Sequence, residues 1–270
     1  MSRLTAKFEA LRQAQRKALI PFITAGDPTP EFTVPALHAM VEAGADIIEL
    51  GVPFSDPMAD GPVIQKASER ALVHKMGLRR VLGLVREFRA QDAETPVVLM
   101  GYLNPIEAMG YAAFVEQAKE AGVDGVLTVD LPPEESSELL PLLHEAGIDP
   151  IYLLAPNSTE ERIRKMGQLG RGYLYYVSLK GVTGASHMDL GEVERKLAEI
   201  KALTQLPVGV GFGVKDAQIA AAIAAFADAV VVGSALVGKI EAAGNQTDRA
   251  LAEIVALLQS MRSAMDAASS

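Results

Sequence analysis

The chain of 270 residues contains no cysteine, and this absence removes several kinds of chemistry at once. Disulfides, thiol nucleophiles and thiolate metal sites are all excluded. The same absence fits a reducing compartment, and we therefore expect the protein in the cytoplasm.

Positive charge is scarce as well. Lysine and arginine total 25 against 34 aspartates and glutamates, which gives a formal net charge of −9. Nucleic acid phosphates and anionic lipids repel a chain of this charge, so binding to nucleic acid or to a membrane surface is disfavoured.

The sequence also lacks a hydrophobic run that could span a membrane. The longest candidate, Ile219 to Ala235, is interrupted by Asp228 and falls short of roughly 18 uninterrupted apolar residues. We expect a helix followed by a strand there. Hydrophobic residues still make up 49% of the chain and charged residues 22%, which is typical of a globular protein with a large core.

A repeated phrase gives the organisation of the chain. Glu42–Asp46, Glu120–Asp124 and Glu145–Asp149 each read Glu-Ala-Gly-x-Asp and precede an apolar run, and Phe226–Asp228 is a shortened copy. The glycine suits the left-handed position after a helix, and a strand is expected about two residues later. The apolar runs predict eight strands, near residues 18–25, 46–52, 96–102, 124–130, 150–155, 172–179, 206–211 and 228–233.

Amphipathic helical segments separate these strands, and strict alternation of strand and helix requires a parallel sheet. Eight such units in about 250 residues predict an α/β fold, a closed (β/α)8 TIM barrel, as a single domain over residues 1–270. Residues 1–17 place Leu4, Phe8 and Leu11 at helical spacing. We interpret them as an amphipathic helix that covers the bottom of the barrel, because Glu9 and the lack of an apolar core argue against an export signal.

The most informative segment, residues 48–62, carries two carboxylates. Glu49 ends the apolar run of the second strand, where barrel enzymes place their chemistry. Asp60 lies in a loop that Pro53 and Pro57 stiffen. In a purely structural interpretation, Glu49 forms an ion pair with a lysine or arginine from a distant part of the chain. Asp60 is then an ordinary turn residue. Two acids in different environments can instead supply a proton donor and a charge stabiliser.

Glycines follow the seventh and eighth strands, where these barrels often bind phosphate through backbone N–H groups. They occur as Gly211-Phe212-Gly213 and as Gly233-Ser234. Loop glycines are also common for conformational reasons, but at these two loops together they predict a phosphorylated substrate.

After the sixth strand, Gly181-Val-Thr-Gly184 resembles a lid that could exclude water. Lys180 raises a rival chemistry, since a lysine there could form a Schiff base with a carbonyl substrate. A lysine beside a flexible glycine is more typically solvated. Alternation along the sixth strand puts Tyr173 and Tyr175 on one side, with Tyr176 in ordinary packing. No metal site is predicted, because the histidines lack ligand spacing; they are His38, His74, His144 and His187.

Several motifs, in order along the whole chain, resemble the tryptophan synthase alpha chain family. They are residues 21–28, 48–62, 130–134, 181–184, 211–213 and 233–234. The resemblance implies a (β/α)8 barrel that splits indole-3-glycerol phosphate into indole and D-glyceraldehyde 3-phosphate. It also implies that indole passes to a pyridoxal-phosphate beta chain in an α2β2 complex, and that this chain has no cofactor of its own.

By position, the resemblance makes Glu49 the general acid and base and Asp60 the partner of the indole N–H. Thr183 would close over the site and contact Asp60. The implied phosphate contacts are Gly184, Gly213, Gly233 and Ser234. The implied indole pocket consists of Phe22, Met100, Leu127, Tyr175, Phe212 and Val231. The implied contacts with the beta chain are Asp56, Pro57, Asn104 and Pro132.

Two other functions stay open at this point. One is a Schiff-base sugar-phosphate aldolase that uses Lys180. The other is a non-catalytic phosphate-binding subunit that regulates a partner, although such a subunit would be expected to have lost Glu49 or Asp60, and both are present.

Overall fold

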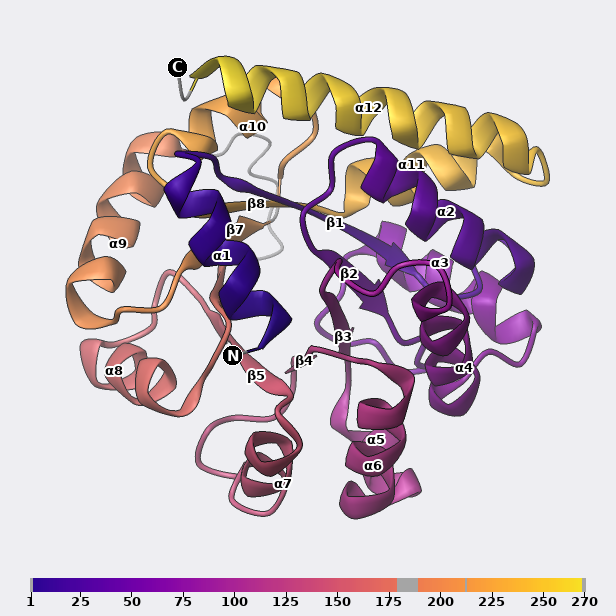
Figure 1. The fold of residues 1–270 in the computed structure, drawn as a ribbon, viewed down its shortest axis with the longest axis horizontal. Coiled ribbons are helices and arrows are strands. Elements are labelled where there is room, and N and C mark those ends of the chain that lie inside the picture. Colours follow the sequence, from indigo (N-terminus) through magenta and orange to yellow (C-terminus); the bar gives the residue numbers. More distant parts are fainter. Residues whose placement is uncertain (1, 179–188, 212, 269–270) are drawn as a thin grey trace.

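The predicted barrel is confirmed in a computed structural model, which describes residues 2–178, 189–211 and 213–268 (Figure 1). Eight parallel strands close in sequence order, each bonded to the next and β8 to β1. The strands are β1 Ala18–Thr24, β2 Ile48–Gly51, β3 Val97–Gly101, β4 Gly125–Thr128, β5 Asp149–Leu154, β6 Leu174–Val177, β7 Val208–Gly211 and β8 Ala229–Val232. All eight fall on the predicted runs, most with shorter ends, and residue 179 of the sixth run lies outside the described residues.

Helices surround the strands as an outer ring (Figure 1). They are α1 Arg3–Gln13, α2 Pro30–Glu42, α3 Pro62–Val73, α4 Leu78–Arg89, α5 Leu103–Met109, α6 Tyr111–Ala121, α7 Leu139–Ala146, α8 Glu160–Leu169, α9 Leu190–Leu203, α10 Ala217–Ala224, α11 Ser234–Ala243 and α12 Thr247–Ala268. The apolar side chains of α4 form a buried stripe, which consists of Leu78, Val81, Leu82, Val85 and Phe88. The long α12 packs on α10 and α11.

Helix α1 crosses the end of the barrel where the strands begin (Figure 1). Its apolar side chains Leu4, Phe8 and Leu11 are buried in one cluster with inward-facing strand residues, which include Tyr173. The rings of Phe8 and Tyr173 are 5.8 Å apart. The predicted covering helix is therefore confirmed, and it fills the bottom of the barrel with side chains.

The repeated phrase has a structural explanation at the same end of the barrel. In three of the four copies the aspartate accepts a backbone N–H group of the preceding strand: Asp46 from Leu19 at 2.9 Å and Asp124 from Val97 at 2.8 Å. Asp228, in the shortened copy, accepts the N–H of Val208 at 2.9 Å. Each of these three aspartates thus joins two adjacent strands where they begin, and so helps to fix their register. The side chain of Asp149, in the third full copy, instead accepts the Ser2 hydroxyl at 2.6 Å.

A basic side chain pairs with each of the three aspartates that join strands. Arg262 lies 3.1 Å from Asp46 and Lys201 lies 3.0 Å from Asp228. Asp124 pairs with Arg89 at 2.5 Å, and Arg3 of α1 joins it at 2.9 Å. The helices are in this way tied to the strand beginnings by charge.

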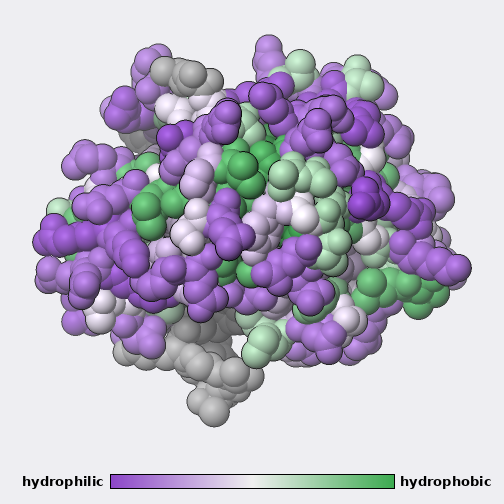
Figure 2. Space-filling view, turned by 90° about the horizontal axis from the view of Figure 1, so that it is seen from below, coloured by the Kyte–Doolittle hydropathy of each residue, from purple (hydrophilic) through white to green (hydrophobic). Residues whose placement is uncertain are grey.

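Hydrophilic side chains cover most of the face shown in Figure 2, with hydrophobic ones gathered near its centre. Among the described residues, only Met58 and Val73 are large hydrophobic residues that are strongly exposed, at 86% and 78%. No helix in the described part of the chain is long and apolar enough to cross a membrane.

We expect Asp124→Ala to lower the free energy of unfolding by about 3 kcal/mol, because it leaves the buried Arg89 without its carboxylate. Urea denaturation followed by circular dichroism measures this change. Asp248→Ala, at an exposed position in the first turn of α12, is the matched control and should cost less than about 1 kcal/mol. Equal losses in the two variants would contradict the role given to Asp124.

Candidate active site

Glu49 places its carboxyl inside the barrel. Its neighbours Ile48 and Leu50 pack outward against the helices, so alternation along β2 turns Glu49 inward. The side chain is fully buried. No basic residue pairs with it among the described residues; instead, the hydroxyl of Tyr173, the residue before β6, donates a hydrogen bond to Oε1. The ion-paired alternative for Glu49 therefore finds no support in the described part of the chain.

Burial changes the chemistry of this carboxyl. Desolvation raises the pKa of Glu49 from 4.5 to about 8, and the hydrogen bond from Tyr173 opposes the rise only in part. The group is therefore protonated at neutral pH. Its second oxygen, Oε2, is buried and has no hydrogen-bond partner among the described residues. Glu49 also lines the main cavity, so this carboxyl can give a proton to a bound molecule.

Asp60 lies in the loop between β2 and α3, half-buried at the edge of the same cavity. The Tyr102 hydroxyl donates a hydrogen bond to its Oδ2 at 3.1 Å and accepts the Ala59 N–H at 3.0 Å. Gln65 Nε2 donates to the Asp60 carbonyl oxygen at 2.9 Å. The loop is thus held from two sides by side-chain contacts.

Asp60 has a different protonation state from Glu49. Burial raises its pKa from 3.8 to about 6, with Tyr102 opposing the rise. At neutral pH Asp60 is therefore mostly ionised, whereas Glu49 is mostly protonated. The two acids are poised for different tasks, as the sequence predicts for this pair.

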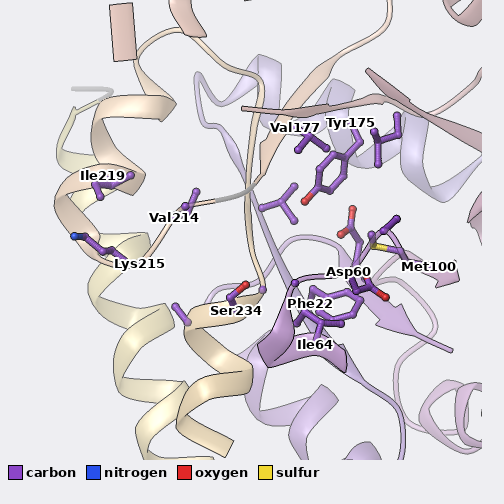
Figure 3. A pocket seen from close by; sticks show the side chains of 18 of the residues that line it. Phe22, Asp60, Ile64, Met100, Tyr175, Val177, Val214, Lys215, Ile219 and Ser234 are labelled. Atoms are coloured by element: carbon purple, nitrogen blue, oxygen red, sulfur yellow. The ribbon is translucent and has the colours of Figure 1, made fainter. Parts of the chain in front are cut away.

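The two acids share a cavity of about 840 Å³ at the carboxyl ends of the strands (Figure 3). Among the predicted residues that line it are Phe22, Met100, Tyr175, Gly213, Val231, Gly233 and Ser234. Leu127 is fully buried in the barrel interior with Tyr175 and Val231, and it is not part of the cavity wall. Thr183, Gly184, Phe212 and Lys180 lie outside the described residues.

One end of the cavity suits an anion. Gly213 follows β7 with a positive φ of 78°, and Gly233 precedes Ser234, the first residue of α11. No side chain caps this helix in the described structure, so N–H groups of its first turn are available to a ligand. Lys215 lies on the same side of the cavity, opposite Asp60 in Figure 3.

The other end is apolar and tightly built. Phe22, Ile64 and Met100 gather around Asp60 in Figure 3. A β-carbon on Gly211 would lie 1.9 Å from the Tyr175 hydroxyl oxygen, so only glycine fits at this position. A flat apolar group bound beside Asp60 could therefore carry an anionic group that reaches Gly233.

Sequence reasoning missed several residues of this site. Val129 and Val177 line the cavity wall two residues beyond Leu127 and Tyr175, which the family resemblance implies. Alternation along the two strands is the signal that points to both valines. It places Tyr173 beside Tyr175 but does not predict its bond to Glu49. Tyr102, at the end of a predicted strand, gave no comparable signal.

A metal centre finds no support in the described residues, which hold no group of three or more histidine, aspartate or glutamate side chains placed to bind a metal ion. His38, His74 and His144 are not in the cavity wall. His187 lies outside the described residues.

Comparison with known proteins gives a consistent answer over the whole chain. Residues 8–266 match the sequence model of the family described as tryptophan synthase alpha chain. The tryptophan synthase alpha chain of Methylococcus capsulatus is 71% identical over 99% of this chain and 100% of that protein. That of Thioalkalivibrio sulfidiphilus is 62% identical over 98% and 100%. The crystal structure of tryptophan synthase subunit alpha from Legionella pneumophila superposes with a TM-score of 0.92, at 48% identity and 99% coverage of both chains.

We expect Tyr173→Phe to raise the pKa of Glu49 above about 8, because the lost hydrogen bond favours the ionised carboxylate. A ¹³C NMR titration of the glutamate carboxyl carbons measures it. Tyr176→Phe is the control, since Tyr176 is buried on the same strand but packs outward. An unchanged or lowered pKa in Tyr173→Phe would contradict the coupling.

Folding raises this pKa from 4.5 to about 8, so the folded chain holds an extra proton between these values. The free energy of unfolding should therefore fall as the pH rises through that window.

Proposed function

The chain belongs to the tryptophan synthase alpha chain family, and from this premise we propose how its residues share the reaction. The protein is a carbon–carbon lyase of tryptophan biosynthesis, which cleaves indole-3-glycerol phosphate to indole and D-glyceraldehyde 3-phosphate. One observation carries the assignment of roles: a fully buried Glu49 that is protonated at neutral pH and keeps a buried oxygen without a partner among the described residues.

Glu49 acts as the general acid and then as the base. Its proton goes to the ring carbon of indole that carries the glycerol phosphate chain, which puts positive charge on the ring nitrogen. The hydroxyl on the adjacent chain carbon then loses its proton to the Glu49 carboxylate and becomes the aldehyde. The carbon–carbon bond breaks, and its electron pair returns to the ring and restores indole. Glu49 ends the reaction protonated, as it began.

Asp60 stabilises the intermediate charge. Its carboxylate, mostly ionised at neutral pH, accepts the indole N–H and lies beside the nitrogen when that atom becomes positive. Fixed charges of this kind act strongly because they need no reorganisation during the reaction. The hydrogen bond from Tyr102 and the loop contact of Gln65 support this role.

The substrate follows the polarity of the cavity, with its ring in the apolar end and its phosphate at the glycines. The phosphate contacts are Gly184, Gly213, Gly233 and Ser234. The ring contacts are Phe22, Met100, Tyr175, Phe212 and Val231, and Leu127 packs in one cluster with Tyr175 and Val231 beneath the cavity. Thr183 closes over the site and contacts Asp60. The uncapped start of α11 supports the phosphate position. The roles of Thr183, Gly184 and Phe212, which lie outside the described residues, rest on the family resemblance alone.

The alternative functions have less support. A Schiff-base aldolase would depend on Lys180, which lies outside the described residues. A subunit that only binds phosphate would not need a buried, protonated acid beside an ionised one. The pairing of Glu49 and Asp60 in one cavity favours catalysis.

Membership of this family implies a tryptophan synthase beta chain as partner. We further propose an α2β2 complex in the cytoplasm, in which pyridoxal phosphate belongs to the beta chain and this chain acts without a cofactor. The contact face comprises Asp56, Pro57, Asn104 and Pro132, which follow β2, β3 and β4 on the side of the cavity. Met58 supports this face, because its strongly exposed side chain lies in the same loop as Asp56.

We expect Glu49→Gln to abolish indole release while inorganic phosphate still binds, because glutamine cannot give the proton. Asp60→Asn should lower kcat by about 10²- to 10³-fold, the loss usual for an electrostatic group. Both are measured on purified chain with indole-3-glycerol phosphate, with and without a beta chain. Substantial turnover by Glu49→Gln would rule out the assigned acid.

We expect Met58→Ala to raise the Kd for a beta chain about tenfold, since it removes an apolar side chain buried in the contact. Val73→Ala, the other strongly exposed large hydrophobic residue among those described, is the control and should leave the Kd unchanged. Titration calorimetry gives both values, and sedimentation of the complex tests the two-to-two stoichiometry. Equal effects of the two substitutions on the Kd would show that the loop with Met58 is not part of the contact with the beta chain.

A further inference from the structure

A threonine at the end of β1 has a hydroxyl group without an evident role. Thr24 is only 2% exposed. Its position, two residues after the inward-facing Phe22, turns the side chain toward the barrel interior. The buried Oγ1 has no hydrogen-bond partner among the described residues. Buried hydroxyl groups are nearly always bonded, so this one calls for a partner.

Thr24 lines a small cavity beside the main one, and the two cavities have Asp60 and four apolar residues in common: Phe22, Ile64, Met100 and Val129. The other polar walls of the small cavity are Asp60, Tyr102 and Ser68, and its volume is about 10 Å³. A volume of roughly one probe sphere is the space that a single buried water needs. A water in such a place also needs two to four polar partners, and the walls supply them.

Two glycines of the neighbouring strands contribute to the cavity wall. Gly51 ends β2 and Gly101 ends β3. A β-carbon on Gly51 would lie 2.6 Å from Phe22 Cζ, and one on Gly101 would lie 3.2 Å from Val52 Cβ. The lack of side chains at both strand ends leaves the space between Thr24 and Asp60 unfilled by protein.

We propose that Thr24 is a positioning residue for Asp60, which it reaches through one water molecule in this small cavity. Tyr102 already donates to Oδ2 of Asp60. The Thr24 hydroxyl donates to the water, and the water donates to the carboxylate from a second direction. The carboxylate is then held in one orientation toward the main cavity and its ionised form is favoured. The inference rests on the role proposed for Asp60.

The neighbouring tyrosines and Glu49 do not change their protonation state near pH 6, where Asp60 titrates. Tyr102, between β3 and α5, and Tyr175 of β6 face Asp60. Burial raises the pKa of both phenols, so they stay neutral. Glu49, from β2, stays protonated below its pKa of about 8. Lys215 and Asp216, before α10, line the far side of the main cavity. The substrate phosphate also titrates at about pH 6, but it is the same in every variant. A loss of activity at acid pH, centred near 6, is therefore assigned to Asp60 by its absence in Asp60→Asn.

The test compares Thr24→Val, which keeps the shape and removes the hydroxyl, with Thr24→Ser, which keeps the hydroxyl. We expect Thr24→Val to lower kcat about tenfold, the loss expected for one hydrogen bond to a charged group, with little change in KM. The acid side of its pH profile should move to higher pH, because the lost bond favoured the carboxylate. Thr24→Ser should restore both. Thr33→Val is the control, since the buried Thr33 hydroxyl accepts the Gly26 N–H at 2.9 Å, outside the site; it should leave the pH profile unchanged.

An unchanged pH profile in Thr24→Val would overturn the inference if Asp60→Asn, measured beside it, is impaired. If Asp60→Asn is as active as the unaltered chain, the proposed function of Asp60 fails instead. A crystal structure of the unaltered chain is the second measurement, should Thr24→Val not fold. It should show one water within hydrogen-bond distance of Thr24 Oγ1 and the Asp60 carboxylate, and a site without that water would overturn the inference.

Discussion

The burial of one carboxyl group at the centre of a closed barrel is the constraint on which the rest of the site depends. Water cannot stabilise the charge of Glu49 there, so the group keeps its proton at neutral pH. A single bond from Tyr173 holds one oxygen and leaves the other for the reaction. The second acid has to stand nearer the solvent, because only then is it ionised under the same conditions. The division between proton donor and charge stabiliser thus follows from depth in the barrel.

The two ends of the barrel differ in function: one stabilises the fold and the other forms the cavity. At the end where the strands begin, aspartates bridge neighbouring strands and pair with basic side chains of the helices. Helix α1 closes this end, and its Phe8 packs against the ring of Tyr173. The support beneath the proton donor is therefore apolar and rigid. At the other end, loops and glycines shape the cavity, as is usual for this fold.

Much of this could be read from the sequence, because the informative signals are local. The glycine and aspartate of the repeated phrase mark four helix ends and strand beginnings, and the apolar runs complete the count of eight units, which places Glu49 and Asp60 at the active face. The bonds that set their chemistry are not local: Tyr173 is 124 residues from Glu49, and Tyr102 is 42 from Asp60. Alternation gives the face of a strand but not the depth along the barrel, so it does not separate Leu127, beneath the cavity, from Val129 in its wall.

The bond between Glu49 of β2 and Tyr173, the residue before β6, spans the ring, because β2 and β6 face each other across it. Neither half of the barrel, β1 to β4 or β5 to β8, contains both partners. A half-barrel, or a folding intermediate with an open seam, would admit water to the carboxyl and lose the raised pKa. The raised pKa of Glu49 is therefore a property of the completed ring, and the carboxyl keeps its proton at neutral pH only once the ring has closed.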